Sequence, residues 1–434
     1  MNKSAGTSIL LQLLIFCALQ QTKLRCLDLT VLNSKLNTMF YSNVDKNEGT
    51  TSFRSLNIPA GGRAESMGTA YTALADDISF FDYNPAASAV LKNSEAAVFH
   101  NAWISDSAVE TVAATTRFGN LGTGVQLKCF YVPFTEYNST GERTTGNYYS
   151  ETTATLNVSY NFLAGYNFKG IAIGSNLKAA WRSVPDYTDN DTGAIISGSG
   201  LAQSGAAVMA DLGLLFRFNA AKLYVDRDPN LQIGFSLLNA GNAWTGFGAT
   251  VTRDDPLPTK VAAGISYRMI RPLTFTAEFR QPVNLSNITS SEQWSAGGGA
   301  SVQITDFFTC MGGFLLQGAN PRISFGSQFE VNKVQMNINY TFDLTTSMNP
   351  VNHISLSAKI NLGDKGRQKL RDAVDNYYRE GIAYYARGNL TAAIEQWKKA
   401  LELNKYFDPA KEAIKTAERS MQLYRRIVDI QTLE

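Results

Sequence analysis

The chain offers few side chains with the types and spacing that catalysis or metal binding requires. Its two histidines, His100 and His353, are far apart, and neither has ligand spacing to a second histidine or to a cysteine. Each lies inside a strand-like pattern and is expected to fill a core or a lumen. No G-x-S-x-G, P-loop or H-E-x-x-H motif occurs. We therefore predict no catalytic residue, no metal site and no cofactor, and we do not expect an enzyme.

The N-terminus has the order of a secretory signal, in which Lys3 precedes an apolar stretch from Ile9 to Leu19 and then polar residues. The apolar stretch is far shorter than the run of about 20 residues that a membrane-spanning helix needs. Residues 14–17 have a lipobox-like outline, but Phe16 stands where a small residue is needed, which argues against lipidation. We predict a signal peptide at 1–25 and an exported chain.

If Cys17 is removed with the signal, an odd number of cysteines remains, namely Cys26, Cys129 and Cys310. No C-x-x-C spacing joins them, so neither a disulfide framework nor a metal site is indicated.

Charge is sparse and unevenly distributed. Only 18% of the residues are charged, against about 25% in a typical soluble chain. Residues 364–434 hold 14 Lys or Arg and 11 Asp or Glu, so the last 71 residues are far more charged than the rest. Lys and Arg total 39 against 37 acids, which gives no basic footprint for a nucleic-acid partner.

Between Glu95 and Leu362 the chain alternates apolar and polar residues with the period of a β-strand. The segment 334–344 shows the pattern clearly, because Val, Met, Ile, Tyr, Phe and Leu alternate with Gln, Asn, Asn, Thr and Asp. Segments of this kind number about fourteen, and each is near the roughly 9–11 residues of a tilted transmembrane strand. We place them near 95–104, 109–118, 123–132, 154–162, 171–182, 207–218, 230–238, 260–269, 272–280, 294–304, 307–316, 321–331, 333–344 and 352–362.

A soluble β-sandwich would also alternate, but its strands usually have about 5–6 residues and its outer face carries many charges. Here the segments are longer, and the polar face consists of Ser, Thr, Asn, Gln and Gly. Such a face suits a lumen, while the apolar face suits lipid, where the sheet must close to pair its backbone. We predict an all-β transmembrane barrel of about 14 antiparallel strands in contact with outer-membrane lipid.

A segment before the barrel, residues 52–92, does not alternate and is rich in Gly and Ala. A short helix is predicted from Ala64 to Leu74, with turns at 76–77 and 84–85. Forty such residues cannot form a domain alone and must pack inside or against another part of the molecule. Its ordered motif residues are Gly61, Gly62, Arg63, Gly68, Asp76, Asp77, Asn84, Pro85 and Ala86.

This block resembles the N-terminal hatch of the outer-membrane long-chain fatty-acid transporter (FadL-like) family, and also the start of the related PorV-like proteins of bacterial secretion systems. The resemblance covers about residues 52–362, with the motif concentrated in the hatch, although Ala87 stands where the family usually has glycine. It implies a fourteen-stranded barrel blocked by a hatch and facilitated diffusion of a hydrophobic molecule through the outer membrane.

The hatch offers two sets of candidate functional residues. Phe80, Phe81 and Tyr83 are candidates for an apolar ligand surface, with simple packing of the hatch to the wall as the alternative. Arg63, Asp76 and Asp77 are candidates for an ion pair or cap, with a structural latch favoured over ligand binding. Two long polar loops are expected at about 135–153 and 185–205, on the extracellular side.

After Gly363 the apolar period changes to that of a helix. The residues that follow the tetratricopeptide pattern are Tyr378, Gly381, Tyr384, Gly388, Ala393, Trp397 and Ala400. One repeat is expected over about 374–404, and a further helix from Asp408 to about Ile430. Since about three repeats are needed for independent stability, the tail either folds on the barrel rim or waits for a partner.

The predicted organisation is therefore a signal peptide at 1–25, a polar linker at 26–51, a hatch at 52–92, a barrel at 93–363 and a small all-α periplasmic tail at 364–434. The function expected is outer-membrane transport of long-chain fatty acids or other hydrophobic nutrients. The alternative is a PorV-like scaffold or shuttle for secreted proteins that docks a periplasmic partner through the tail. A general diffusion pore is a third option.

Overall fold

The computed structural model describes residues 35, 38–40, 44–138, 140–166, 168–189, 192–247, 256–345 and 352–431. The predicted signal peptide at 1–25 lies outside these residues, as does most of the predicted linker at 26–51.

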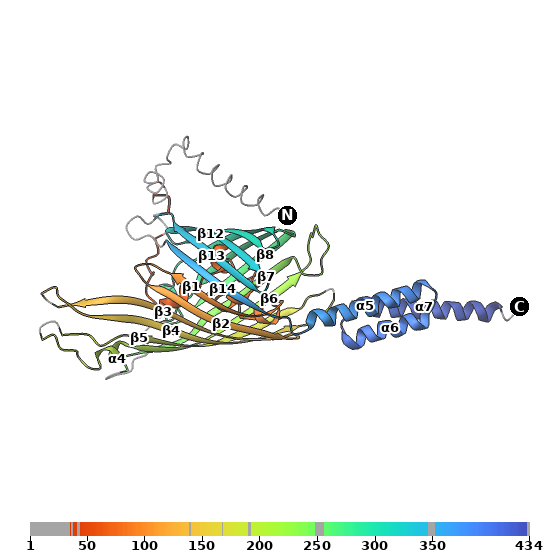
Figure 1. Cartoon of the computed structure of the whole chain (residues 1–434), viewed down its shortest axis with the longest axis horizontal. Coiled ribbons are helices and arrows are strands. Elements are labelled where there is room, and N and C mark those ends of the chain that lie inside the picture. The colour runs from red at the N-terminus through yellow and green to blue at the C-terminus, as the bar shows by residue number, and fades with distance from the viewer. Residues whose placement is uncertain are drawn as a thin grey trace, which may run out of the picture.

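Fourteen antiparallel strands form one closed barrel (Figure 1). Each strand pairs with its neighbours in sequence, and β1 closes the wall against β14. The predicted barrel and its strand number are thus confirmed. The strands are β1 Ser94–Ala102, β2 Ala108–Phe118, β3 Leu121–Tyr137, β4 Arg143–Phe162, β5 Ile171–Ser183, β6 Gly205–Phe218, β7 Leu231–Thr245, β8 Lys260–Ile270, β9 Leu273–Pro282, β10 Ser295–Thr305, β11 Phe308–Gln317, β12 Asn320–Val331, β13 Val334–Asp343 and β14 His353–Gly363.

The alternation in sequence becomes an apolar outer face and a polar inner face. In β13, Met336, Ile338 and Phe342 are exposed on the outside, whereas Asn337 and Asn339 are buried inside. The same exposure of Val, Leu, Ile and Phe recurs on the other strands. A closed sheet with an apolar exterior satisfies every ladder hydrogen bond internally, which is the requirement for spanning a bilayer.

The two ends of the barrel differ. At the end where β1 begins and β14 ends, called here the tail end, the turns 119–120, 271–272, 306–307 and 332–333 are short, while the connections 163–170 and 219–230 are longer. At the opposite end, called the loop end, the connections 184–204 and 246–259 are long. Most turns of the tail end are thus short and the longest loops lie at the loop end, which is the pattern of outer-membrane barrels.

The predicted loop at about 135–153 is wrong. β3 continues to Tyr137 and β4 starts at Arg143, so this segment is a paired hairpin that extends the wall at the loop end. Its Thr and Tyr residues have high strand propensity, and a neighbouring strand satisfies their backbone groups. The segment at 185–205 remains mostly a loop and contains the short helix α4, Ser199–Gln203.

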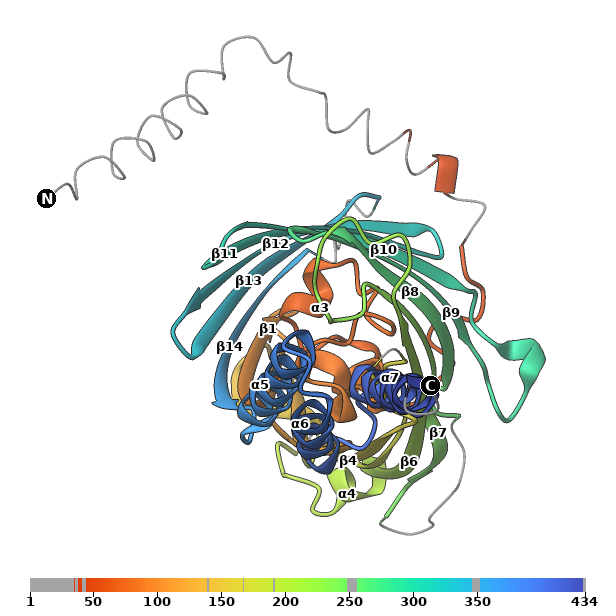
Figure 2. The same cartoon turned by 90° about the vertical axis from the view of Figure 1, so that its right-hand side faces the viewer.

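The hatch lies inside the barrel (Figure 2). It contains η3 Arg54–Asn57, α3 Arg63–Ser66, η4 Ile78–Asp82 and η5 Pro85–Ala89. The predicted helix from Ala64 to Leu74 is wrong, since α3 ends at Ser66. Gly68 and Thr69 have φ angles of 62° and 57°, and two successive left-handed residues cannot continue a right-handed helix.

Three helices follow the barrel and extend away from its tail end (Figure 1). They are α5 Arg367–Ala386, α6 Leu390–Leu403 and α7 Asp408–Gln431. Trp397 is buried between α5 and α6, where its Nε1 donates to the Tyr378 carbonyl at 3.1 Å. None of the helices in the described part of the chain is long and apolar enough to cross a membrane.

Candidate functional site: a loop-end cavity above the hatch

The hatch fits its wall because the wall has glycine where the hatch backbone approaches. A Cβ at Gly313 would lie 1.9 Å from the backbone nitrogen of Gly68, and one at Gly122 would lie 2.1 Å from the carbonyl carbon of Ser88. No side chain larger than hydrogen fits at such distances. The small residues of the hatch and of the wall are therefore both required for the close approach of the hatch backbone to the wall.

The motif Asn84-Pro85-Ala86 joins two segments of the hatch and ties them to the barrel wall. The Asn84 side chain caps η5 by accepting from the Ala86 nitrogen at 3.1 Å. Its amide nitrogen also donates to the Thr72 carbonyl at 2.8 Å and to the Leu214 carbonyl of β6 at 3.0 Å. Pro85 occupies the first turn of η5, and Ala86 is fully buried.

Two acidic residues of the hatch are held by buried cations. Arg63 and Asp76 form an ion pair of 2.8 Å, and the Tyr71 hydroxyl bonds to both Asp76 and Asp77. Asp77 also lies 3.5 Å from Lys359 of β14. Burial disfavours the Asp77 carboxylate, but the Lys359 and Arg63 charges outweigh it and hold its pKa below the ordinary value.

A second buried link joins the hatch to β3. Lys128 Nζ lies 3.1 Å from the Asp82 carboxylate, and both side chains are largely buried. Burial opposes ionisation of Asp82, but Lys128, with Lys178 and Lys260 further away, holds its pKa below the ordinary value. The hatch is thus fixed to the wall by charge pairs as well as by close packing.

Phe80, Phe81 and Tyr83, the candidates for an apolar ligand surface, lie in this packed interface. The rings of Phe80 and Phe81 are fully buried and stack with centroids 4.4 Å apart. Tyr83 packs edge-on against Tyr71. None of the three lines the cavity described next.

A cavity of about 540 Å³ lies at the loop end, between the hatch and the wall. Thr51 and the first residues of the hatch, from Ser52 to Pro59 except Leu56, form one side of it. Its wall combines apolar rings and aliphatic groups with charged groups. The apolar lining is Phe53, Ile58, Pro59, Trp103, Ile104, Phe130 and Leu315, and the charged lining is Glu48, Arg54, Glu65, Glu151, Arg182, Arg280 and Arg322.

Three arginines reach the cavity from different strands. Arg280 is already occupied, because it pairs with Glu278 at 2.5 Å and donates to the Thr69 hydroxyl at 2.8 Å. The Nε groups of Arg182 and Arg322 are buried without a hydrogen-bond partner. The Arg182 guanidinium also lies 5.2 Å above the Phe53 ring. An acidic group entering the cavity would supply the missing acceptors.

The carboxylates of the cavity are, in contrast, satisfied. Glu65 is buried and accepts from Ser355 Oγ at 2.5 Å and from His353 Nε2. Glu151 accepts from the Tyr149 hydroxyl at 2.6 Å and from the Ser55 nitrogen at 3.3 Å. Apart from the hydroxyls of Thr51 and Ser52, the unpartnered buried polar atoms of the lining are the Nε groups of Arg182 and Arg322.

The two histidines have different surroundings. His353 faces the lumen, as expected, and its ring lies 4.3 Å from that of Trp103. The expectation that His100 fills a core or lumen is wrong, because His100 is exposed on the outer face of β1 and bonds to Glu110 at 2.7 Å. Among the described residues, no group of three or more His, Cys, Asp or Glu could hold a metal ion.

The sequence patterns did not predict the arginines of the cavity. Arg182, Arg280 and Arg322 are far apart in the chain and follow no local motif. A signal was nevertheless present. In segments with so little charge, an arginine near a strand end, on the same face as the Ser, Thr and Asn residues, marks a lumenal position.

The tail residues with the helical-repeat pattern converge on the contact between α5 and α6. Gly381 lies under the indole of Trp397, and Ala393 and Ala400 are fully buried beside it. Tyr384 packs against the same cluster, and Gly388, with a φ of 78°, lies just after the end of α5.

The fold and its apolar exterior define a membrane-spanning β-barrel of the outer-membrane type, with a hatch inside its lumen. The chain belongs to UPF0164, an uncharacterised protein family, whose model matches residues 31–365.

Its relatives include a UPF0164 protein of Treponema pallidum (strain Nichols) that is 29% identical over 391 residues, covering 88% of this chain and 86% of that protein. A second from the same organism is 26% identical over 397 residues, covering 87% and 78%.

Among solved structures, the CymD monoaromatic hydrocarbon channel matches with a TM-score of 0.46 and 14% identity, covering 70% of this chain and 97% of that one. A Pseudomonas aeruginosa FadL homologue matches with a TM-score of 0.43 and 11% identity, covering 70% and 97%.

Proposed function

We propose that this protein is an outer-membrane transporter that admits a long-chain fatty acid, or another hydrophobic nutrient with an acidic head, by facilitated diffusion. The loop-end cavity carries the proposal. Its volume of about 540 Å³ falls within the roughly 300–1,000 Å³ of small-molecule sites. Aromatic and aliphatic walls suit an alkyl chain, and the unpartnered Nε groups of Arg182 and Arg322 suit a carboxylate.

The hatch is the gate in this proposal. It fills the lumen on the tail side of the cavity, and its contacts with Lys128 and Lys359 hold it in place. A ligand that has entered from the loop end can advance only after the hatch shifts or a side exit opens. The resemblance of the hatch motif to that of the FadL-like family supports this role.

The tail lies in the periplasm in this proposal. Ser94, where β1 begins, is paired with Gly363, where β14 ends, so hatch and tail both join the barrel at the end with short turns. Short turns face the periplasm in outer-membrane barrels. Protease added to intact cells should therefore leave the tail uncut. Cleavage of the tail would indicate the opposite orientation of the barrel in the membrane.

Binding of a labelled long-chain fatty acid to the refolded full chain in non-ionic detergent tests the transport proposal. Arg322→Met should weaken fatty-acid binding at least tenfold and leave binding of the fatty alcohol of equal length unchanged. Arg143→Met, in the exposed hairpin between β3 and β4, is the matched control. Absence of saturable binding by a well-folded wild-type barrel would overturn the proposal.

A scaffold or shuttle for secreted proteins is the second candidate, and two observations favour it. The hatch plugs the lumen tightly, and α7 exposes Leu423, Tyr424 and Ile427 beyond its contacts with α6. The α5–α6 pair has the helix–turn–helix arrangement of a tetratricopeptide repeat, which would dock a periplasmic partner. Leu423→Glu with Ile427→Glu should then abolish cross-linking to that partner while fatty-acid binding stays unchanged.

A further inference from the structure

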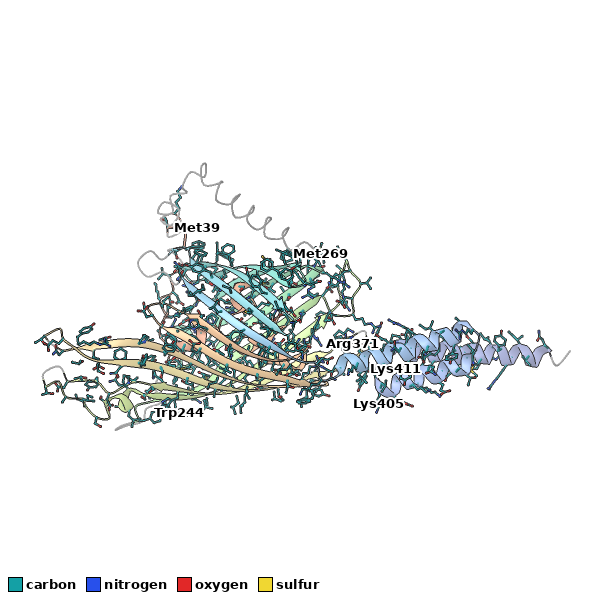
Figure 3. All side chains as sticks on the ribbon, in the orientation of Figure 1. Met39, Trp244, Met269, Arg371, Lys405 and Lys411 are labelled. Atoms are coloured by element: carbon teal, nitrogen blue, oxygen red, sulfur yellow. The ribbon has the colours of Figure 1, made fainter. Side chains whose placement is uncertain are left out.

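A cluster of cations surrounds the tail-end mouth of the barrel, far from the loop-end cavity. Its members come from five parts of the chain, namely the end of the hatch, the ends of β2 and β6, the connection 163–170 and the start of α5. They are Lys92, Arg117, Lys169, Arg217, Arg367 and Arg371. Arg371 lies where the tail leaves the barrel (Figure 3).

Backbone carbonyls hold these side chains together. Arg117 and Arg367 both donate to the Leu91 carbonyl, at 3.0 and 3.3 Å. Arg217 donates to the Lys169 carbonyl at 2.9 Å. The Arg117 and Arg367 guanidinium groups are thus held near each other, and Arg217 is held at the backbone of Lys169, by contacts that do not neutralise their charge.

The carboxylates nearby are too few and are already engaged. Asp228 pairs with Lys92 at 2.6 Å, and Asp364 accepts from backbone nitrogens at the start of α5. Among the described residues, no carboxylate forms an ion pair with Arg117, Arg217 or Arg371. Burial, together with the Arg371 charge, lowers the pKa of Lys169 and of Arg367.

One donor of the cluster is buried without any acceptor. Arg217 Nε has no hydrogen-bond partner, although its Nη2 is bonded to the Lys169 carbonyl. A buried unsatisfied guanidinium nitrogen beside other uncompensated cations is costly unless an anion completes the site.

We propose that this cluster is a binding site for a phosphate group, with Arg117, Arg217 and Arg371 as its main donors. Phosphate offers several acceptor oxygens and more than one negative charge, and it matches the planar guanidinium fork. The phosphate can come from a phospholipid head group or from a soluble phosphate compound. Phe118, the next residue of β2, is exposed on the outer face, so Arg117 points to the opposite, inner side of the wall at the barrel mouth.

Calorimetry of the full chain in non-ionic detergent, titrated with inorganic phosphate, tests the site. A second arm uses native mass spectrometry after reconstitution with phosphatidylcholine or phosphatidylglycerol. The variant is Arg371→Gln, whose exposed side chain should leave folding intact, and Arg217→Gln is a second variant. Arg387→Gln, exposed at the far end of α5, is the matched control.

Saturable phosphate binding that weakens at least tenfold in Arg371→Gln, and not in Arg387→Gln, would support a site for soluble phosphate. Retention of phosphatidylglycerol alone, with the same dependence on Arg371, would support a head-group site. No binding in either arm, or an equal loss in variant and control, would overturn the proposal. This result is independent of fatty-acid binding at the opposite end of the barrel.

Discussion

The hatch and the tail both lie outside the barrel wall in sequence, but they depend on the wall to different degrees. The hatch core around Phe80 and Phe81 is completed by residues of the wall, such as Phe99 and Met311. The tail core around Trp397 consists of tail residues, with only Tyr166 added from a barrel turn. The hatch therefore folds only with the barrel, whereas the tail supplies most of its own packing.

The largest expected effect comes from adding a side chain to the wall under the hatch. Gly313→Val places atoms where the Gly68 backbone lies, so the hatch cannot seat without moving. The loss of folding free energy should exceed ~1–3 kcal/mol, which is the usual cost of overpacking a core. Limited proteolysis measures whether the hatch is seated. The change of electrophoretic mobility on heating measures the stability of the barrel. Gly312→Val, on the outer face of the same strand, should behave as wild type.

A comparable effect is expected for Lys359→Met. The substitution leaves the buried carboxylates of Asp77 and Glu95 without their shared cation, which lies 3.5 and 3.4 Å from them. Breaking a buried charge pair in this way costs about 3–5 kcal/mol. The thermal midpoint of the refolded protein should fall markedly, while the helix signal of the tail persists. An unchanged midpoint would contradict the role assigned to Lys359.

Acid should loosen the hatch before it affects the tail. Asp82 has a folded pKa below its ordinary value of 3.8, because Lys128 stabilises the carboxylate. A depressed pKa contributes stability that is full above 3.8 and is lost as the pH falls through the folded value. Protease accessibility of the hatch should therefore rise only below that pH. In Asp82→Asn this rise should be smaller, and an identical pH profile would exclude Asp82 as its source.

The smallest effect is expected at the joint between barrel and tail. Arg227 pairs with Asp375 of α5 at 2.5 Å, but the arginine side chain is 41% exposed. Exposed ion pairs contribute at most about 1 kcal/mol. Arg227→Gln should leave the barrel unchanged and speed proteolysis near residue 364 by less than fivefold. A fall in the thermal midpoint of the barrel would show that the tail supports the wall more than its few contacts indicate.

The wall was predictable because alternation is a local property that the membrane enforces on every strand. The strands β8 to β14 agree with their predicted ranges within about two residues, a normal uncertainty of strand boundaries. The tail helices were predictable from a different local pattern, since Ala393, Trp397 and Ala400 repeat with helical spacing. The extension of β3 and β4 was missed because polar Thr and Asn residues signal a loop when the strand partner is unknown.

The cavity could not be predicted from local pattern. Arg182 and Arg322 are 140 positions apart in the sequence, and only closure of the barrel brings them to one space. The length of the hatch helix was overestimated for a related reason. Its left-handed residues, Gly68 and Thr69, follow the contour of the wall at Gly313, and a local sequence rule does not include that wall.

The hatch runs through its own barrel from one end to the other, which constrains how the protein can be assembled. Residues before it bond to the loop end, where Gln293 donates its backbone nitrogen to Asp45, and Leu91 emerges among the arginines of the tail end. The closing seam joins the first strand to the last. The hatch is therefore synthesised before the strand that completes the enclosure. During biogenesis it can act as an internal template, against which the strands register before the ring is sealed.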